Sequence, residues 1–208
     1  MKKIVLISFL TFITLTSFSQ YKKLHEDSLF FPLGNNNIPP KLDKLANDYW
    51  TGYLKSVGKK SLYKDTLINE SYRLIYWGNY LAFVEIIKKA DQYIIITDSI
   101  VWGSMKSYHS YDTLNNPVLI NDIKEKSLEL YAFKDTHEEF KEVMEFELIE
   151  STDDRDNWLI EFKIDDNYWV HSSIEVNSKL KELILLLMRA AKLEGFDLYT
   201  KNGNHEKY

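Results

Sequence analysis

The sequence predicts an α+β protein built on an antiparallel β-meander, with a helix before the strands and another after them. Aromatic and β-branched runs follow one another from Tyr72 onward, separated by short turn signals, and helically spaced apolar residues precede and follow those runs. We expect about seven to nine strands. The sheet is expected to be curved or to form a nearly closed half-barrel.

Residues 1–19 have the layout of a secretory signal peptide. Lys2 and Lys3 precede an apolar run that ends near Leu15, and Ser17 and Ser19 are small residues suited to cleavage. The run is about a dozen residues long, whereas a membrane span needs roughly 20. We therefore expect export with cleavage after Ser19 and no membrane span in the mature chain. An irregular leader over residues 20–40 follows.

The spacing of apolar residues after Pro39 and Pro40 predicts an N-terminal helix that ends at Gly58, because glycine commonly terminates helices. The residues on its apolar face are Leu42, Leu45, Ala46, Tyr49, Tyr53, Leu54 and Val57.

The strands are predicted from a change of period at Tyr72. The runs 72–77, 80–87 and 93–99 are separated by short polar segments, which predicts antiparallel strands joined by tight turns. Several of these runs are apolar on both faces, so we expect helices, or the sheet itself, to cover both faces. Residues 102–121 show no clear period, and further strands are predicted at 127–133, 143–150, 158–164 and 168–174.

A C-terminal helix is predicted to begin at Asn177 or Ser178, which are natural N-caps, and to end before Gly195. Its apolar residues occupy two sides, which favours burial between layers or use in a dimer. We assign residues 41–200 to a single α+β domain and residues 201–208 to a polar tail.

Composition narrows the class of protein. The chain has no cysteine, which excludes disulfides, thiolate metal sites and the lipid-bearing cysteine of a bacterial lipoprotein. Many Lys, Asn and Ile residues favour a bacterial source, so we expect a periplasmic or secreted protein. Its net charge of −5 leaves no basic stripe for a phosphate backbone, and nucleic acid is not an expected partner. We expect no cofactor and no metal.

Negative charge gathers in one part of the chain. An acidic patch there can bind a basic protein partner or a divalent cation. Alternatively, it is a solvated face that keeps an exported protein soluble. The residues of the patch are Glu138, Glu139, Glu142, Glu145, Glu147, Glu150, Asp153, Asp154 and Asp156.

The hairpin at 158–174 offers a candidate catalytic pair, Glu161 and His171. A three-residue loop at 165–167 places the two side chains opposite each other on one face. A carboxylate in that position orients the imidazole as a general base. The alternative is an ordinary cross-strand salt bridge on a solvent face. Neither a Gly-x-Ser-x-Gly motif nor a glycine-rich phosphate loop is present.

Aromatic residues provide a candidate ligand-binding surface, because flat rings beside acidic and amide groups suit sugars, peptides or apolar ligands. The alternative is that these rings pack in the core of the sheet. The candidate ligand-binding residues are Trp102, Tyr108, His109, Tyr111 and Trp169.

The first functional hypothesis is an exported bacterial envelope binding protein whose partner is a protein or a small molecule. An immunity or inhibitor-type protein that uses the acidic patch is one form of it. A hydrolase built on Glu161 and His171 is an alternative, although an enzyme is less expected. The other alternative is a structural envelope component that forms a homodimer through its C-terminal helix.

Overall fold

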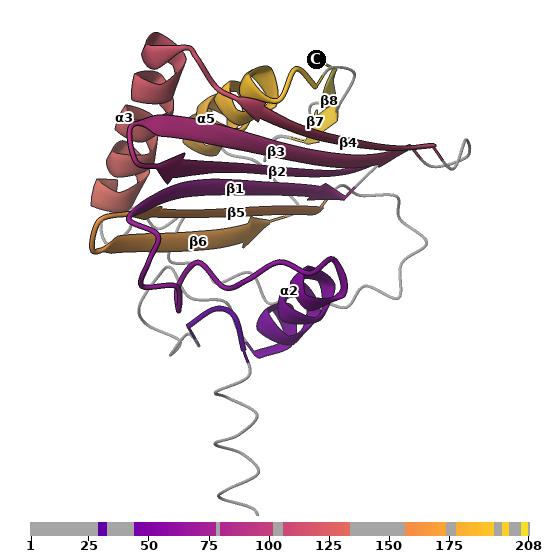
Figure 1. Ribbon diagram of the computed structural model, residues 1–208. Helices are drawn as coiled ribbons and strands as arrows, with labels where there is room; N and C mark the ends of the chain where they lie inside the picture. Colours follow the sequence, from indigo (N-terminus) through magenta and orange to yellow (C-terminus); the bar gives the residue numbers. More distant parts are fainter. Residues whose placement is uncertain are drawn as a thin grey trace, which may run out of the picture.

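The computed structural model describes residues 29–32, 44–77, 80–101, 106–133, 157–173, 178–193, 197–199 and 205–207. Its centre is one antiparallel sheet of six strands in the order β4-β3-β2-β1-β5-β6 (Figure 1). The strands are β1 (Glu70–Trp77), β2 (Tyr80–Lys89), β3 (Gln92–Val101), β4 (Lys106–Thr113), β5 (Asn157–Ile164) and β6 (Asn167–Ser173).

Helices cover both faces of the sheet. In Figure 1, α2 (Lys44–Ser56) lies on one face, and α3 (Pro117–Phe133) and α5 (Ser178–Ala190) lie on the other. The first four strands form a meander, and the chain returns through α3 to place β5 beside β1. The predicted α+β class and the double-sided coverage of the sheet are therefore confirmed.

The alternation of β1 divides the core into two clusters. Leu74 and its even-numbered neighbours pack against α3 and α5, whereas Ile75 packs on the α2 side. Trp50 of α2 is fully buried against this second cluster, and its Nε1 donates to Ser172 Oγ of β6 at 2.9 Å. Burial on both faces explains why the central strands read as continuous apolar runs.

A short piece of the predicted leader is held against α2. Phe31 is buried, and its carbonyl accepts a hydrogen bond from Asn47 Nδ2 at 2.8 Å. Thr51 Oγ1 accepts from the Phe30 backbone N–H at 2.9 Å and donates to Asn47 Oδ1. Two polar side chains on the buried face of α2 thus fix the segment 29–32.

α2 ends just before Gly58, where the sequence predicts a helix end. Gly58 has a φ of 69°, and its N–H donates to the Lys55 carbonyl while the Lys59 N–H donates to the Leu54 carbonyl. This pair of bonds is the Schellman arrangement, in which the residue after the helix takes the left-handed conformation that glycine adopts without strain. The prediction of a helix end at Gly58 is confirmed.

Several sequence predictions about the sheet differ from the structure. Six strands form the sheet in the described part of the chain, so the predicted seven to nine are confirmed only in part, and the sheet is open rather than nearly closed. Residues 127–133, predicted as a strand, belong to α3, and residues 106–113, where no period was found, form β4. The predicted strand at 143–150 lies outside the described residues.

The last two described strands lie outside the six-stranded sheet. β7 (Asp197–Tyr199) and β8 (His205–Lys207) form a separate two-stranded pair, so part of the predicted polar tail is paired. The predicted signal peptide lies outside the described residues. Among the helices that are described, none is both long and apolar enough to cross a membrane.

Candidate functional site

A groove of about 350 Å³ lies on the α2 face of the sheet, between the end of α2 and strands β2 to β4. Most of its walls are apolar, and its polar groups come from β3, from β4 and from the Tyr53 hydroxyl of α2. We call it the α2 groove. Its lining residues are Tyr53, Val57, Leu81, Phe83, Asp98, Ser99, Ile100, Ser107, Tyr108 and His109.

The strand register places the polar groups of the α2 groove. Phe83 of β2 pairs with Asp98 of β3, and Asp98 pairs with His109 of β4. Directly paired residues in an antiparallel sheet point to the same face, so these three side chains form one row. Phe83 is buried at the floor, whereas His109 is exposed at the outer side of the groove.

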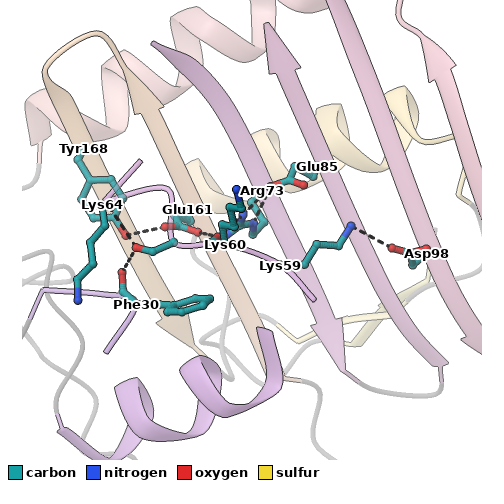
Figure 2. Close-up of polar contacts among 10 residues, drawn as sticks. Phe30, Lys59, Lys60, Lys64, Arg73, Glu85, Asp98, Glu161 and Tyr168 are labelled. Atoms are coloured by element: carbon teal, nitrogen blue, oxygen red, sulfur yellow. Dashed lines mark hydrogen bonds and ion pairs between the residues drawn. The ribbon is translucent and has the colours of Figure 1, made fainter. Parts of the chain in front are cut away.

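Lys59 contacts this row of side chains from the segment that follows α2. The Schellman turn at Gly58 redirects the chain over the sheet, and the Lys59 ammonium lies 4.2 Å from the centre of the Phe83 ring. The same ammonium is 3.3 Å from Asp98 Oδ2, and Figure 2 shows this contact as a dashed line. Lys59 is only 15 % exposed, so its position is well fixed.

Asp98 joins two partners through its two oxygens. Oδ2 contacts Lys59, while Oδ1 contacts His109 Nδ1. A carboxylate that holds Nδ1 fixes the orientation of the imidazole and leaves Nε2 available to another group. On the wall of the groove, burial and the Asp98 charge raise the pKa of Tyr53 to about 12, so its phenol remains a neutral hydroxyl.

A buried ionic cluster lies beside the α2 groove on the same face of the sheet (Figure 2). Arg73 of β1 is flanked by Glu161 of β5 and Glu85 of β2, with which it pairs directly. Its Nη1 is 2.6 Å from Glu161 Oε2 and its Nη2 is 2.5 Å from Glu85 Oε1. Arg73 is 1 % exposed and Glu161 is fully buried.

Further hydrogen bonds complete the ionic cluster. Arg73 Nη2 donates to the Lys60 carbonyl at 2.9 Å, and the Tyr168 hydroxyl donates to Glu161 Oε1 at 2.8 Å. Burial raises the pKa of Glu161 despite the opposing effect of Arg73. The cluster is closed to a ligand because its central side chains are covered, and its evident role is to tie β5, β1 and β2 to the segment after α2.

The predicted pairing of Glu161 with His171 is wrong in register. The turn has two residues, Asp165 and Asp166, so Ile164 pairs with Asn167 and every later pair shifts by one. Glu161 therefore pairs with Val170 on the α2 face, whereas His171 pairs with Ile160 on the opposite face. A one-residue shift reverses the face of each side chain, so the two groups are separated by the sheet.

His171 occupies a different environment from the one predicted. Its ring stacks on Trp169 with a centroid distance of 5.6 Å and an interplanar angle of 17°. Burial lowers the pKa of His171 to about 4, which keeps the imidazole neutral at physiological pH.

The structure brings together only part of the predicted ligand-binding set. Tyr108, His109 and Tyr111 lie on β4 and are exposed, and two of them line the α2 groove. Trp169 is fully buried in the α3 and α5 core, where its ring stacks on Phe162 at 5.2 Å, so its ring is not at the surface. Trp102 lies outside the described residues.

The acidic patch also lies outside the described residues. Within the part of the chain that the structure describes, no three His, Asp or Glu side chains are arranged to hold a metal ion.

Sequence reasoning missed Arg73, Glu85, Asp98 and Lys59. A signal for the first two was present, because each is a charged residue in the middle of an apolar strand run. A charge at a buried position requires a partner of opposite sign, which predicts that the two meet. For Asp98 and Lys59 no comparable signal exists, since Asp98 stands between Thr97 and Ser99 in β3 and Lys59 stands between Gly58 and Lys60 after the end of α2.

Comparison of the chain with protein-family models, curated proteins and solved structures gives no match. Function is therefore inferred from the side chains of the α2 groove.

Proposed function

We propose that this chain is an exported bacterial binding protein that holds its ligand in the α2 groove. The observation that carries the proposal is the fixed polar row of Lys59, Asp98 and His109 among the apolar walls of a 350 Å³ groove. Ligand sites typically combine mostly apolar walls with a few well-positioned polar groups.

The chemistry of the groove defines the class of ligand. Val57 and Ile100 offer contact to an apolar or aromatic group, and His109 Nε2 and the Tyr53 hydroxyl offer hydrogen bonds. The Asp98 carboxylate is already shared by Lys59 and His109, so a ligand need not carry a charge. Glu161 and His171 do not provide a second candidate, because they lie on opposite faces of the sheet.

Replacing Val57 with Arg is expected to weaken ligand binding by about tenfold or more. Val57 lines the groove and is 42 % exposed, so a long charged side chain can occupy the groove with little cost to folding. The measurement is a titration of the isotope-labelled chain with N-acetyl-tryptophan amide and N-acetyl-leucine amide, followed by amide chemical shifts.

Val118→Arg is the matched control, because Val118 is 70 % exposed on α3, on the other face of the sheet. We expect the wild type and Val118→Arg to show shifts at Phe83, Asp98 and His109 at the same ligand concentrations, and Val57→Arg to need about tenfold more ligand for the same shifts. Equal binding by Val57→Arg and Val118→Arg, or no shift at the groove with either probe, contradicts the proposal.

A further inference from the structure

The strand that forms the outer side of the α2 groove is an edge strand. β4 is the outermost strand in the sheet order, and in the described part of the chain it pairs only with β3. An edge strand presents a row of backbone N–H and C=O groups that can pair with another polypeptide.

The register identifies which backbone groups of β4 face outward. The Leu114 N–H donates to the Tyr93 carbonyl at 2.8 Å, which sets the hydrogen-bonding phase between β3 and β4. Because this phase alternates along an antiparallel pair, Tyr108, Ser110 and Asp112 direct their backbone groups toward β3. The outward-facing groups therefore belong to Ser107, His109 and Tyr111.

The side chains of these same residues lie on the α2 face. His109 is in the row of Phe83 and Asp98, and residues two apart on a strand share a face, so Ser107 and Tyr111 flank it. Ser107 and His109 also line the α2 groove. One stretch of β4 thus presents both an open backbone edge and one side of the groove.

The central part of β4 lacks the features that usually prevent strand addition. Residues 107–111 contain no proline, lysine, arginine or carboxylate, and Tyr108 and Tyr111 are 57 % and 59 % exposed. Proteins commonly protect edge strands with proline, charge or a covering element. β6 is the edge strand on the other side of the sheet. It differs from β4 because Trp169 and Val170 are buried on its two faces, whereas the side chains at the centre of β4 are exposed.

We infer that the ligand is an extended polypeptide segment that pairs with β4 as an additional strand. Its backbone bonds to the outward N–H and C=O groups of Ser107, His109 and Tyr111, and one apolar or aromatic side chain leans over His109 into the α2 groove. Backbone pairing then supplies affinity and the groove supplies side-chain specificity. This inference rests on the proposed function, which it makes more specific.

Tyr111→Pro and Tyr111→Ala are the variants that test it. Proline at 111 removes one outward N–H and leaves the bonds between β4 and β3 intact, whereas alanine removes the side chain and keeps the N–H. The probes are peptides selected on the wild-type chain from a displayed library of random peptides long enough to cover β4. We expect about tenfold weaker binding by Tyr111→Pro and less than about threefold by Tyr111→Ala.

A second measurement does not depend on the fold of the proline variant. Methylating each backbone nitrogen of a selected peptide in turn is expected to weaken binding at every other residue, since only alternate residues of an added strand bond to β4. Uniform effects along the peptide, or equal binding by Tyr111→Pro and Tyr111→Ala in their folded forms, overturn the inference.

The outcomes separate the inference from the proposed function. If the capped amino acids bind the groove in a Val57-dependent way and no selected peptide depends on the 111 N–H, the inference fails and the groove remains a ligand site. If no probe perturbs the groove, both fail. A homodimer that Tyr111→Pro dissociates overturns the assignment of a separate peptide, because β4 then pairs with a second copy of the chain.

Discussion

Replacing Arg73 with Met is expected to lower the free energy of unfolding by about 3–5 kcal/mol, measured by urea denaturation at pH 7. The substitution leaves Glu85 and Glu161 buried without a cation, at 5 % and 0 % exposure. Removing one partner from a buried ionic cluster lowers the free energy of unfolding by more than the intact cluster adds to it, because the remaining charges stay desolvated.

Two comparisons test this explanation. The combined variant Arg73→Met, Glu85→Leu and Glu161→Leu is expected to recover most of the loss, because it removes the unpaired charges together with the cation. The loss in Arg73→Met is also expected to shrink from pH 7 to pH 5, because burial raises the pKa of Glu161 and the variant lacks the Arg73 charge that opposes this, so protonation of Glu161 stabilises the variant more than the wild type. A cost below about 1 kcal/mol for Arg73→Met shows that the cluster is not sealed from water.

Acidification from pH 6.5 to pH 4 is expected to destabilise the protein through His171. Burial lowers the pKa of His171 from 6.5 to about 4, so the unfolded chain binds a proton in this range that the folded chain does not. Stability from this group is therefore complete above about pH 6.5 and declines toward pH 4. At ~1.4 kcal/mol per pKa unit, the decline amounts to about 3 kcal/mol.

His171→Phe isolates this contribution, because phenylalanine keeps a flat ring beside Trp169 and has no group that titrates. The raised pKa of Glu161 acts with the opposite sign and is present in both proteins, so it cancels in the difference. Urea unfolding of both chains at several pH values is expected to show the wild type losing stability relative to His171→Phe as the pH falls. Parallel curves contradict a His171 whose imidazole stays neutral in the folded chain.

The strands that the sequence predicted are those buried on at least one face. The apolar runs of β1, β2, β3, β5 and β6 were found because burial requires apolar side chains at regular positions. β4 was missed for the opposite reason, since both of its faces are exposed over residues 107–111 and no apolar alternation is needed there.

The helix α3 was missed because a polar residue lies on its buried stripe. Leu119, Ile123, Ser127 and Leu130 are the buried residues of that stripe, and the Ser127 hydroxyl donates to the Ile123 carbonyl at 2.8 Å. This internal hydrogen bond satisfies the buried serine but breaks the apolar pattern. A helix start was nevertheless encoded, because Asn116 Oδ1 accepts from the Leu119 N–H and Pro117 occupies the first turn.

The sequence predicted site residues that can be recognised individually. It did not predict those that depend on a partner in another strand. His109 was found as a polar residue among exposed aromatics, and it does lie in the α2 groove. Its partner Asp98 was not found, because a cross-strand pair depends on a register that the sequence does not reveal. The same uncertainty of one residue in the β5–β6 turn gave the incorrect pairing of Glu161 with His171.

The most direct test of the proposed binding surface is amide hydrogen exchange along β4, measured by NMR with and without a selected peptide. We predict that the peptide slows exchange at Ser107, His109 and Tyr111 and changes little at Tyr108 and Ser110, which already bond to β3. Protection that appears instead around the cavity lined by Tyr93, Asn121 and Lys124, with β4 unchanged, contradicts the assignment of the ligand site to the α2 groove and its edge strand.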